Sequence, residues 1–142
     1  IDYSNNEPGV FFEIEPEFQW LAGRNLRIEL DHTYNQLRIP AGRLYTANIS
    51  RVRCVYQFNR RMFVRAIVQN VHYDFNRSAY DEPDDQDDVY QRIASQFLFS
   101  YTVNPQTVVY VGYSDNTRAY NDSPLTQTDR VFFFKLGYAW VL

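Results

Sequence analysis

The fold is indicated most clearly by residues 131–142, which read Val131-Phe132-Phe133-Phe134-Lys135-Leu136-Gly137-Tyr138-Ala139-Trp140-Val141-Leu142. Every second residue from Phe132 to Leu142 is apolar or aromatic, and Lys135 lies among the positions between them. Successive side chains of a β-strand point to opposite faces, so a period of two predicts a strand with one apolar face. We expect this strand to close an antiparallel β-barrel.

Six further segments show the same alternation, and the sequence therefore predicts an all-β fold of about seven to eight antiparallel strands. The segments are residues 10–20, 26–34, 44–58, 62–70, 93–103 and 108–114. Residues 22–25 (Ala-Gly-Arg-Asn) and 104–106 (Asn-Pro-Gln) have compositions typical of tight turns. Within 44–58 the apolar positions change from odd to even numbers, which predicts a β-bulge near Asn48, because one extra residue reverses the alternation.

The composition bounds both the fold and the function. The 142 residues suit a single domain, and the 12 Tyr and 11 Phe suit strands, because aromatic side chains pack well on a pleated surface. No apolar run approaches the roughly 18 residues of a spanning helix, so a membrane protein of this sequence would cross with strands. A net charge of -3 with scattered basic residues excludes nucleic acid as an expected partner. The single cysteine, Cys54, excludes an intrachain disulfide.

Alternation alone does not say which face meets solvent, so a soluble β-barrel or β-sandwich with an apolar core is an alternative to a membrane barrel. The predicted connections favour the membrane barrel. Residues 72–88 and 115–128 form long polar segments, whereas the connections that alternate with them are tight turns. Outer-membrane barrels have short periplasmic turns and long extracellular loops. The sequence therefore predicts an up-and-down transmembrane β-barrel in a bacterial outer membrane.

Each strand face then has an expected environment. Aromatic and apolar side chains on one face would meet lipid or form an interfacial girdle; they are Trp20, Phe58, Phe97, Tyr101, Tyr113, Phe132, Phe134, Tyr138 and Trp140. Polar side chains on the other face would line the lumen, where charges of both signs pair across strands; they are Glu13, Glu15, Glu17, Arg27, Glu29, Asp31, Arg51, Arg53, Arg65, Gln69, Gln96 and Lys135. The first three glutamates have the spacing that any polar strand face gives, so we expect a lumen role in preference to a catalytic carboxylate pair.

The order of the strands predicts where the chain enters the barrel. With the C-terminus in the periplasm, seven strands put residues 1–9 outside the cell, whereas complete barrels usually have an even strand count and both ends in the periplasm. We therefore expect residues 1–142 to be the C-terminal portion of a larger barrel, with an unrecognised eighth strand in residues 71–90 as the alternative. Residues 1–6 have no basic stretch and no apolar core, so they do not form a signal peptide.

Few residues suggest chemistry. The acidic segment 81–88 could offer oxygen ligands to calcium or bridge a cation to lipopolysaccharide phosphate, but it lacks the glycine of an EF-hand loop and is expected to be a solvated loop. His32 and His72 are far apart and have no metalloprotease spacing. There is no nucleophile motif, phosphate-binding glycine loop or cofactor fingerprint. We therefore expect no enzymatic activity, cofactor or bound metal.

Four segments together resemble the C-terminal barrel of a family of bacterial outer-membrane proteins of unknown function, in which a carbohydrate-binding family 9-like domain precedes the barrel. The segments are Arg61-Met62-Phe63-Val64-Arg65, Ser95-Gln96-Phe97-Leu98-Phe99-Ser100-Tyr101, Asn104-Pro105-Gln106-Thr107-Val108-Val109-Tyr110-Val111-Gly112-Tyr113-Ser114-Asp115-Asn116 and Gln127-Thr128-Asp129-Arg130-Val131-Phe132-Phe133-Phe134-Lys135-Leu136-Gly137-Tyr138. The resemblance covers most of residues 44–142. The end of the chain departs from the terminal aromatic residue usual in such barrels, because Val141 and Leu142 follow Trp140.

The resemblance implies a large barrel with an upstream β-sandwich that binds glycans, and that sandwich lies outside this sequence. It also implies contacts with outer-membrane lipid and lipopolysaccharide, with the barrel-assembly machinery, and with the N-terminal part of the same protein or other envelope subunits. Three functions follow as hypotheses. The chain is a pore or membrane anchor, the barrel of a glycan-binding or glycan-processing envelope protein, or a soluble β-barrel that binds an apolar ligand.

Overall fold

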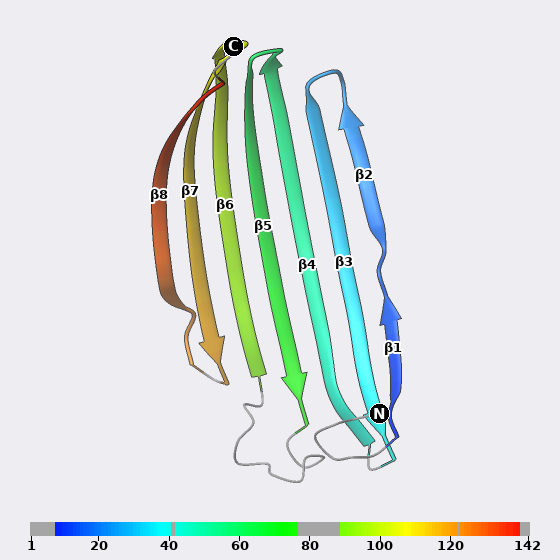
Figure 1. Cartoon of the computed structure of the whole chain (residues 1–142). Helices are drawn as coiled ribbons and strands as arrows, with labels where there is room; N and C mark the ends of the chain where they lie inside the picture. Colours follow the sequence, from blue (N-terminus) through cyan, green and yellow to red (C-terminus); the bar gives the residue numbers. More distant parts are fainter. Residues whose placement is uncertain (1–7, 41, 77–88, 122, 140–142) are drawn as a thin grey trace.

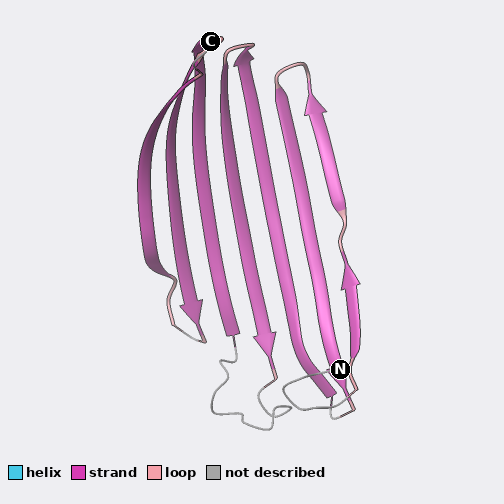
Figure 2. Ribbon diagram, viewed as in Figure 1, coloured by secondary structure: helices cyan, strands magenta, loops and turns pink. Residues whose placement is uncertain are grey.

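The computed structural model describes residues 8–40, 42–76, 89–121 and 123–139, and these form strands and turns with no helix. All the strands belong to one antiparallel sheet, which confirms the predicted all-β antiparallel fold (Figures 1 and 2). They are β1 (Val10–Ile14), β2 (Glu17–Ala22), β3 (Leu26–Ile39), β4 (Gly42–Asn59), β5 (Met62–Phe75), β6 (Val89–Asn104), β7 (Thr107–Tyr120) and β8 (Thr126–Tyr138). From β3 onward each strand pairs with the next one along the chain.

Strands β1 and β2 together occupy one edge position of the sheet, because both pair with β3. The predicted strand 10–20 is thus interrupted at residues 15 and 16. Pro16 has no backbone N–H and cannot complete its part of the ladder, although its carbonyl accepts a hydrogen bond from the His32 backbone N–H at 3.1 Å. The eighth strand arises from this interruption. The described parts of residues 71–90 lengthen β5 to Phe75 and begin β6 at Val89, and residues 77–88 lie outside the described residues.

Tight turns join the strands at one end of the sheet, at residues 23–25, 60–61 and 105–106. The two predicted tight turns are confirmed. Gly23 has a φ of 67°, a conformation that glycine adopts without steric cost. The Asn59 and Asn104 side-chain oxygens accept hydrogen bonds from the backbone N–H groups two residues later, at 2.8 and 3.0 Å, as asparagine commonly does in turns.

The connections at the other end are shorter than predicted. They comprise residues 40–41, 76–88 and 121–125, so the polar segment expected at 115–128 is mostly strand, and only the 76–88 connection is long. The prediction was wrong because the polar residues at the ends of β5, β7 and β8 interrupt the apolar alternation without ending the hydrogen-bonded ladder. The asymmetry between the two ends therefore depends on one connection.

The bulge predicted near Asn48 is also wrong. The register between β3 and β4 runs without interruption past Asn48, and the irregularity in this pair lies between Leu37 and Arg38. Tyr45 and Ile49 consequently lie on the same face of β4 as Arg51. The apolar residues change from odd to even positions along β4 because, near Asn48, the face that carries Asn48 is polar and the opposite face is aromatic, whereas farther along the strand the face that carries Asn48 is apolar.

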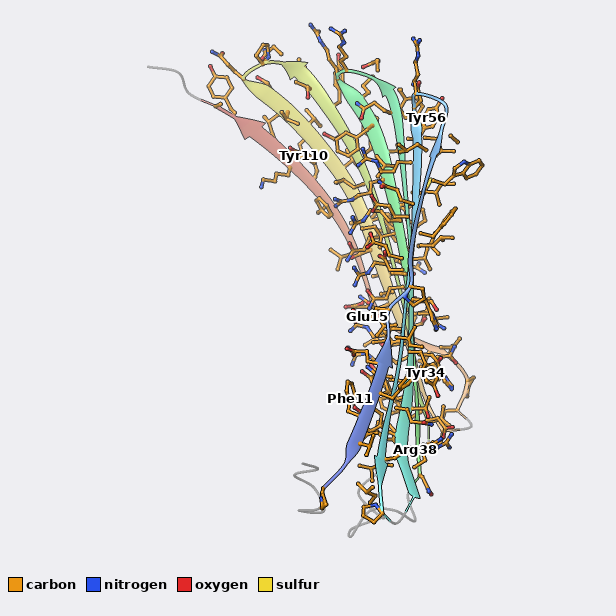
Figure 3. All side chains as sticks on the ribbon, turned by 90° about the vertical axis from the view of Figure 1, so that its right-hand side faces the viewer. Phe11, Glu15, Tyr34, Arg38, Tyr56 and Tyr110 are labelled. Atoms are coloured by element: carbon orange, nitrogen blue, oxygen red, sulfur yellow. The ribbon has the colours of Figure 1, made fainter. Side chains whose placement is uncertain are left out.

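The sheet is twisted and curved, and it does not close, because β1–β2 and β8 are its unpaired edges within the described residues (Figure 1). The upper parts of β7 and β8 bend toward the face on which Glu15 and Tyr110 lie (Figure 3). Tyr34 and Tyr56 lie on the opposite face (Figure 3). We name these the concave face and the convex face. A curved, tilted, open sheet of this kind has the shape of a section of barrel wall.

The described residues form one layer and no second layer packs on either face. Side chains that are both apolar and buried are few, namely Ile39, Leu44, Ala47 and Ala119. Large apolar side chains are instead exposed, and Phe132 and Phe134 have 75% and 68% of their surface accessible. A domain core requires two packed layers, so the apolar surface of this sheet is not a core.

Among the described residues, no helix has the length and apolar character needed to cross a bilayer.

Candidate functional site

The convex face carries a continuous band of apolar side chains. The described residues that the sequence assigned to lipid or to the girdle all lie on this one face, and they are Trp20, Phe58, Phe97, Tyr101, Tyr113, Phe132, Phe134 and Tyr138. Phe58 lies at an irregularity of the register, and its ring centroid is 4.9 Å from that of the convex residue Tyr56. Trp140 lies outside the described residues. Aromatic rings on neighbouring strands are in contact, since the centroid of Tyr113 lies 6.2 Å from that of Phe97 and 4.7 Å from that of Phe132.

The band shifts along the strands from one edge of the sheet to the other. Trp20, near the upper limit of the band on β2, lies in the same cross-strand row as Phe132, the lowest large apolar residue of the band on β8. Barrel strands tilt by about 35–45° to the barrel axis. A flat apolar layer that crosses tilted strands would produce a shift of this kind.

Beyond the band, toward the 76–88 connection, the convex face becomes polar. One row there contains Asn48, His72 and Gln91, and the next row toward the band begins with His32, whose ring Nδ1 is 2.9 Å from the Ser50 hydroxyl. Strands β3 to β8 have 13 to 18 residues, whereas crossing a bilayer takes about 9–11. Each strand is therefore long enough to span an apolar layer and to continue beyond it into a polar one.

Asp115 organises a polar cluster at the border of the band. Its Oδ2 accepts hydrogen bonds from the Tyr113 hydroxyl at 2.6 Å and from the Gln127 amide at 2.8 Å, and it lies 3.4 Å from an Arg130 guanidinium nitrogen. The Tyr113 hydrogen bond is the largest of the causes that hold the pKa of Asp115 below its ordinary 3.8. The cluster fastens β8 to β7 directly outside the apolar band.

This cluster predicts an acid-dependent stability. A carboxyl group whose folded pKa is depressed contributes stability that is present above its unfolded pKa of 3.8 and is lost as the pH falls through the folded pKa. We expect Asp115→Asn to lower the melting temperature at pH 6 and to differ less from the wild type near pH 3. Circular dichroism melts of detergent-folded protein measure both differences. A difference of equal size at the two pH values would contradict this role of the carboxylate.

The concave face carries all twelve polar residues that the sequence assigned to a lumen, namely Glu13, Glu15, Glu17, Arg27, Glu29, Asp31, Arg51, Arg53, Arg65, Gln69, Gln96 and Lys135. The expected pairing of charges between strands is rare among them. Arg53 and Glu29 form the one ion pair among these twelve side chains, with 2.8 Å between the guanidinium nitrogen and the carboxylate oxygen. Most of these charged side chains therefore form no direct ion pair with one another.

Two further arginines on the concave face were missed from the sequence. Arg92 and Arg118 lie directly opposite each other on β6 and β7. The sequence does contain a signal for them. Arg92 is four residues from Gln96 on β6, and Arg118 is four residues from Ser114 on β7, so the alternation predicts that each arginine shares the concave face with its partner. It was obscured because the surrounding residues are polar on both faces.

The concave face is aromatic at the end nearest the 76–88 connection. A row of rings crosses four strands, with centroids 6.4 Å apart for Tyr45 and Tyr73, 6.2 Å for Tyr73 and Tyr90, and 5.3 Å for Tyr90 and Tyr120. Phe75 stacks on Tyr73 at 5.7 Å. Burial raises the pKa of the Tyr45 hydroxyl, and the neighbouring Tyr73 adds to the effect. Near the 76–88 connection the convex face is thus polar and the concave face aromatic, whereas along the apolar band the convex face is apolar and the concave face carries charged residues.

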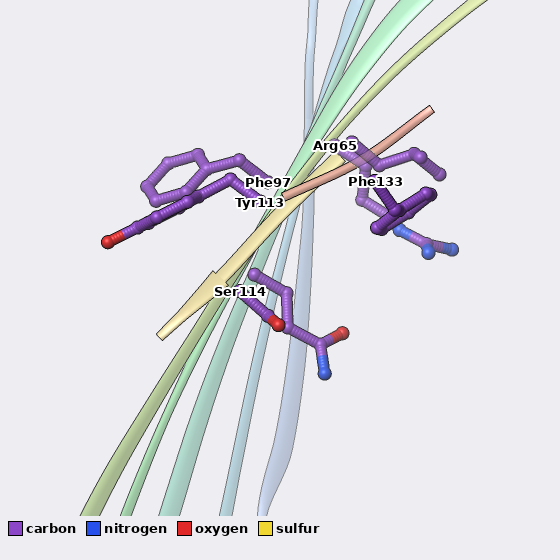
Figure 4. Close-up of a pocket in the computed structure, with 7 residues that line it drawn as sticks. Arg65, Phe97, Tyr113, Ser114 and Phe133 are labelled. Carbon is purple, nitrogen blue, oxygen red and sulfur yellow. The ribbon is translucent and has the colours of Figure 1, made fainter. Parts of the chain in front are cut away.

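Gly112 has no side chain on the concave face of β7, and the Phe133 ring of β8 lies over its backbone in the space that a side chain would fill. A Cβ atom placed on Gly112 would lie 2.1 Å from the Phe133 Cε1 atom. A hollow of about 170 Å³ adjoins this space. Figure 4 shows Arg65 and Ser114 on the same side of the sheet as Phe133, with Phe97 and Tyr113 on the other side.

No group of three or more histidine, cysteine or acidic side chains among the described residues is arranged to hold a metal ion. Cys54 has a free thiol on the convex face. The acidic segment 81–88 lies outside the described residues.

Comparison of the chain with protein-family models, with curated proteins and with solved structures found no match. The functional argument therefore depends on the two faces of the sheet.

Proposed function

We propose that this chain forms part of the wall of a bacterial outer-membrane β-barrel, with its convex face in the lipid and its concave face lining a water-filled pore. The observation that supports this most strongly is the apolar band on the convex face, which shifts across the strands as a flat layer would. Transmembrane barrels have an apolar belt about 25 Å tall on the outside and a polar interior. Lipid would cover side chains such as Phe132 and Phe134, which are exposed in the isolated sheet.

The direction of curvature distinguishes this proposal from a soluble barrel that binds an apolar ligand. A soluble barrel encloses its apolar side chains, which places them on the concave side of the wall. In this sheet the concave side carries the charged residues over the length of the band, and the apolar side chains lie on the convex side. That arrangement supports a membrane barrel.

The composition of the concave face supports a pore in addition to an anchor. Charged side chains such as Arg51 and Asp31 are costly to bury away from water unless they are paired, and these two form no ion pair with any described residue. Water in the lumen would remove that cost. The resemblance to barrels that follow a carbohydrate-binding domain adds a second candidate, in which this pore wall belongs to a glycan-binding or glycan-processing envelope protein.

The natural cysteine offers a direct test of the orientation. We expect Cys54, on the convex face, to be protected from a membrane-impermeant maleimide in native outer membranes and to react after unfolding in urea. In a Cys54→Ser background, Val55→Cys puts a thiol at the next position, on the concave face, and we expect this thiol to react without unfolding. Both positions are half-buried in the isolated sheet, which makes them a matched pair.

The gel mobility of the full polypeptide in the same membranes, with and without boiling, checks that the barrel is folded. A folded protein in which Cys54 reacts and residue 55 is protected would overturn the proposed orientation. A monomer that folds in water without detergent would overturn the membrane proposal itself.

A further inference from the structure

Charges on the concave face are separated by sign across the strands. The acidic residues are on β1, on β2, between these two strands and on β3, and they are Glu13, Glu17, Glu15, Glu29 and Asp31. The central strands β4 to β7 carry Arg51, Arg53, Arg65, Arg92 and Arg118. Among the described residues of β1 to β7, Arg27 on β3 is the exception, whereas the opposite edge strand, β8, carries both signs as Asp129 and Lys135.

Like charges also face each other directly in this arrangement. Glu17 lies opposite Asp31, and Arg92 lies opposite Arg118. Like charges directly across a strand pair destabilise a sheet. Opposite charges also face each other, since Glu29 and Asp31 of β3 lie opposite Arg53 and Arg51 of β4. Sheet stability therefore explains the contact between β3 and β4 but not the two like-charge pairs.

The hydrogen-bonding capacity of the central arginines is largely unused. Arg53 pairs with Glu29, and Arg92 donates to the Asn116 side-chain oxygen at 3.0 Å. Arg51, Arg65 and Arg118 form no side-chain hydrogen bond or ion pair with any described residue. The Nε atoms of Arg53, Arg92 and Arg118 are buried without an acceptor among the described residues. Guanidinium groups present five donors in a fork that matches carboxylate and phosphate oxygens.

The central arginines adjoin a hollow on the concave face. It has a volume of about 210 Å³ and is lined by the polar residues Arg51, Arg53, Gln69 and Gln96 and by the apolar residues Ile67 and Ala94. All four polar side chains carry N–H donors, and no acidic side chain lines the hollow. The chemistry of the lining therefore suits an anion.

The arginines also follow one another along the strands. Arg92 and Arg118 share one cross-strand row, and Arg51, Arg53 and Arg65 occupy the next three rows in turn. Residues on one face of a strand are about 6.6 Å apart, so the four rows extend over about 20 Å. This length is comparable with the height of an outer-membrane apolar belt, about 25 Å.

We infer that the arginines on β4 to β7 form a path for small anions through the barrel, which would favour solutes with carboxylate or phosphate groups over cations. The inference rests on the proposed pore. Closely spaced charges of one sign on a pore wall raise the local concentration of ions of the opposite sign. The free donors would replace water around the anion at successive positions, and the hollow between Arg51 and Gln96 would be one of these positions.

The test is the reversal potential of the full polypeptide in a planar bilayer under a potassium chloride gradient. We expect the wild type to conduct chloride better than potassium. The pair Arg51→Gln with Arg92→Gln should shift the reversal potential toward that of an unselective pore, whereas Glu17→Gln should shift it toward that of a chloride-selective one. Arg38→Gln is the control with which each of these two arginine substitutions, made singly, is compared, because it removes one arginine charge from the convex face.

Acetate and phosphate in place of chloride test the two anion classes. Currents carried by both anions in the wild type, and reduced in the Arg51 and Arg92 variant, would support the inference. A cation-selective wild type, a variant that matches the Arg38→Gln control, or a lumen closed to both oxyanions would overturn the inference and leave the pore in place. The absence of any conductance from barrels with a protected Cys54 would overturn the pore, and the anion path with it.

Discussion

Val64→Arg is expected to destabilise the folded protein in a bilayer by about 2 to 4 kcal/mol, the cost of an arginine near the middle of the lipid-facing belt of a barrel. Val64 lies on the convex face of β5 between Tyr56 of β4 and Phe99 of β6, so the new charge would be surrounded by apolar side chains and lipid. Urea unfolding in lipid vesicles, followed by tryptophan fluorescence, measures the change in the free energy of unfolding.

The neighbouring position provides the control. Phe63 lies on the concave face between Gln57 and Ser100, where an arginine would meet polar side chains and water. Phe63→Arg should therefore cost clearly less than Val64→Arg, although the new residue is the same. Equal costs, or a greater cost at Phe63, would show that the apolar band does not face lipid.

Gly112→Val is expected to displace the Phe133 ring and to destabilise the pairing of β7 with β8. The Cβ atom alone would lie 2.1 Å from Cε1 and 2.2 Å from Cζ of that ring, so the ring must leave its position over the β7 backbone. Overpacking of this kind typically costs about 1–3 kcal/mol. Thermal melts of the detergent-folded protein would record a lower midpoint, and near-ultraviolet circular dichroism would record the displaced ring.

Two variants show whether the clash is the cause. Gly137→Val makes the same substitution on β8, where the nearest atom to the added Cβ is the Val108 carbonyl oxygen at an ordinary 3.7 Å, so its effect should be small. In the Phe133→Ala background, Gly112→Val should cost much less than in the wild type. Additive effects of the two substitutions would contradict the proposed contact.

The sequence was sufficient to assign strands and faces within the apolar band. There the convex residues are apolar and the charged residues lie on the concave face, together with apolar ones such as Ile67 and Phe133, so the period of two is clear. Phe132, Phe134 and Leu136 around Lys135 are the clearest example, and the register places the three on the convex face and Lys135 on the concave face.

Outside the band the same reasoning failed, because apolar and polar residues no longer alternate regularly between the two faces. The ends of β4, β5 and β7 have polar residues on the convex face and tyrosines on the concave face. This pattern predicts a bulge in β4 and polar loops at the ends of β5 and β7, and the structure has strand at all three places. The sequence also did not predict which charged residues of the concave face lie opposite each other. Such pairs, as with Arg92 and Arg118, depend on the register between two strands, and no single segment contains that register.

The missing N–H of Pro16 divides the edge of the sheet into two units that can open separately. Separation of β1 from β3 breaks a short ladder from Val10 to Ile14, and the ladder of β2 can stay closed because it is already interrupted between them. Local opening free energies follow the number of backbone hydrogen bonds and the apolar contacts that break together. In a sheet of these residues alone, β1 is therefore the segment expected to open first, and a further strand paired with its outer edge in a larger barrel would hold it closed.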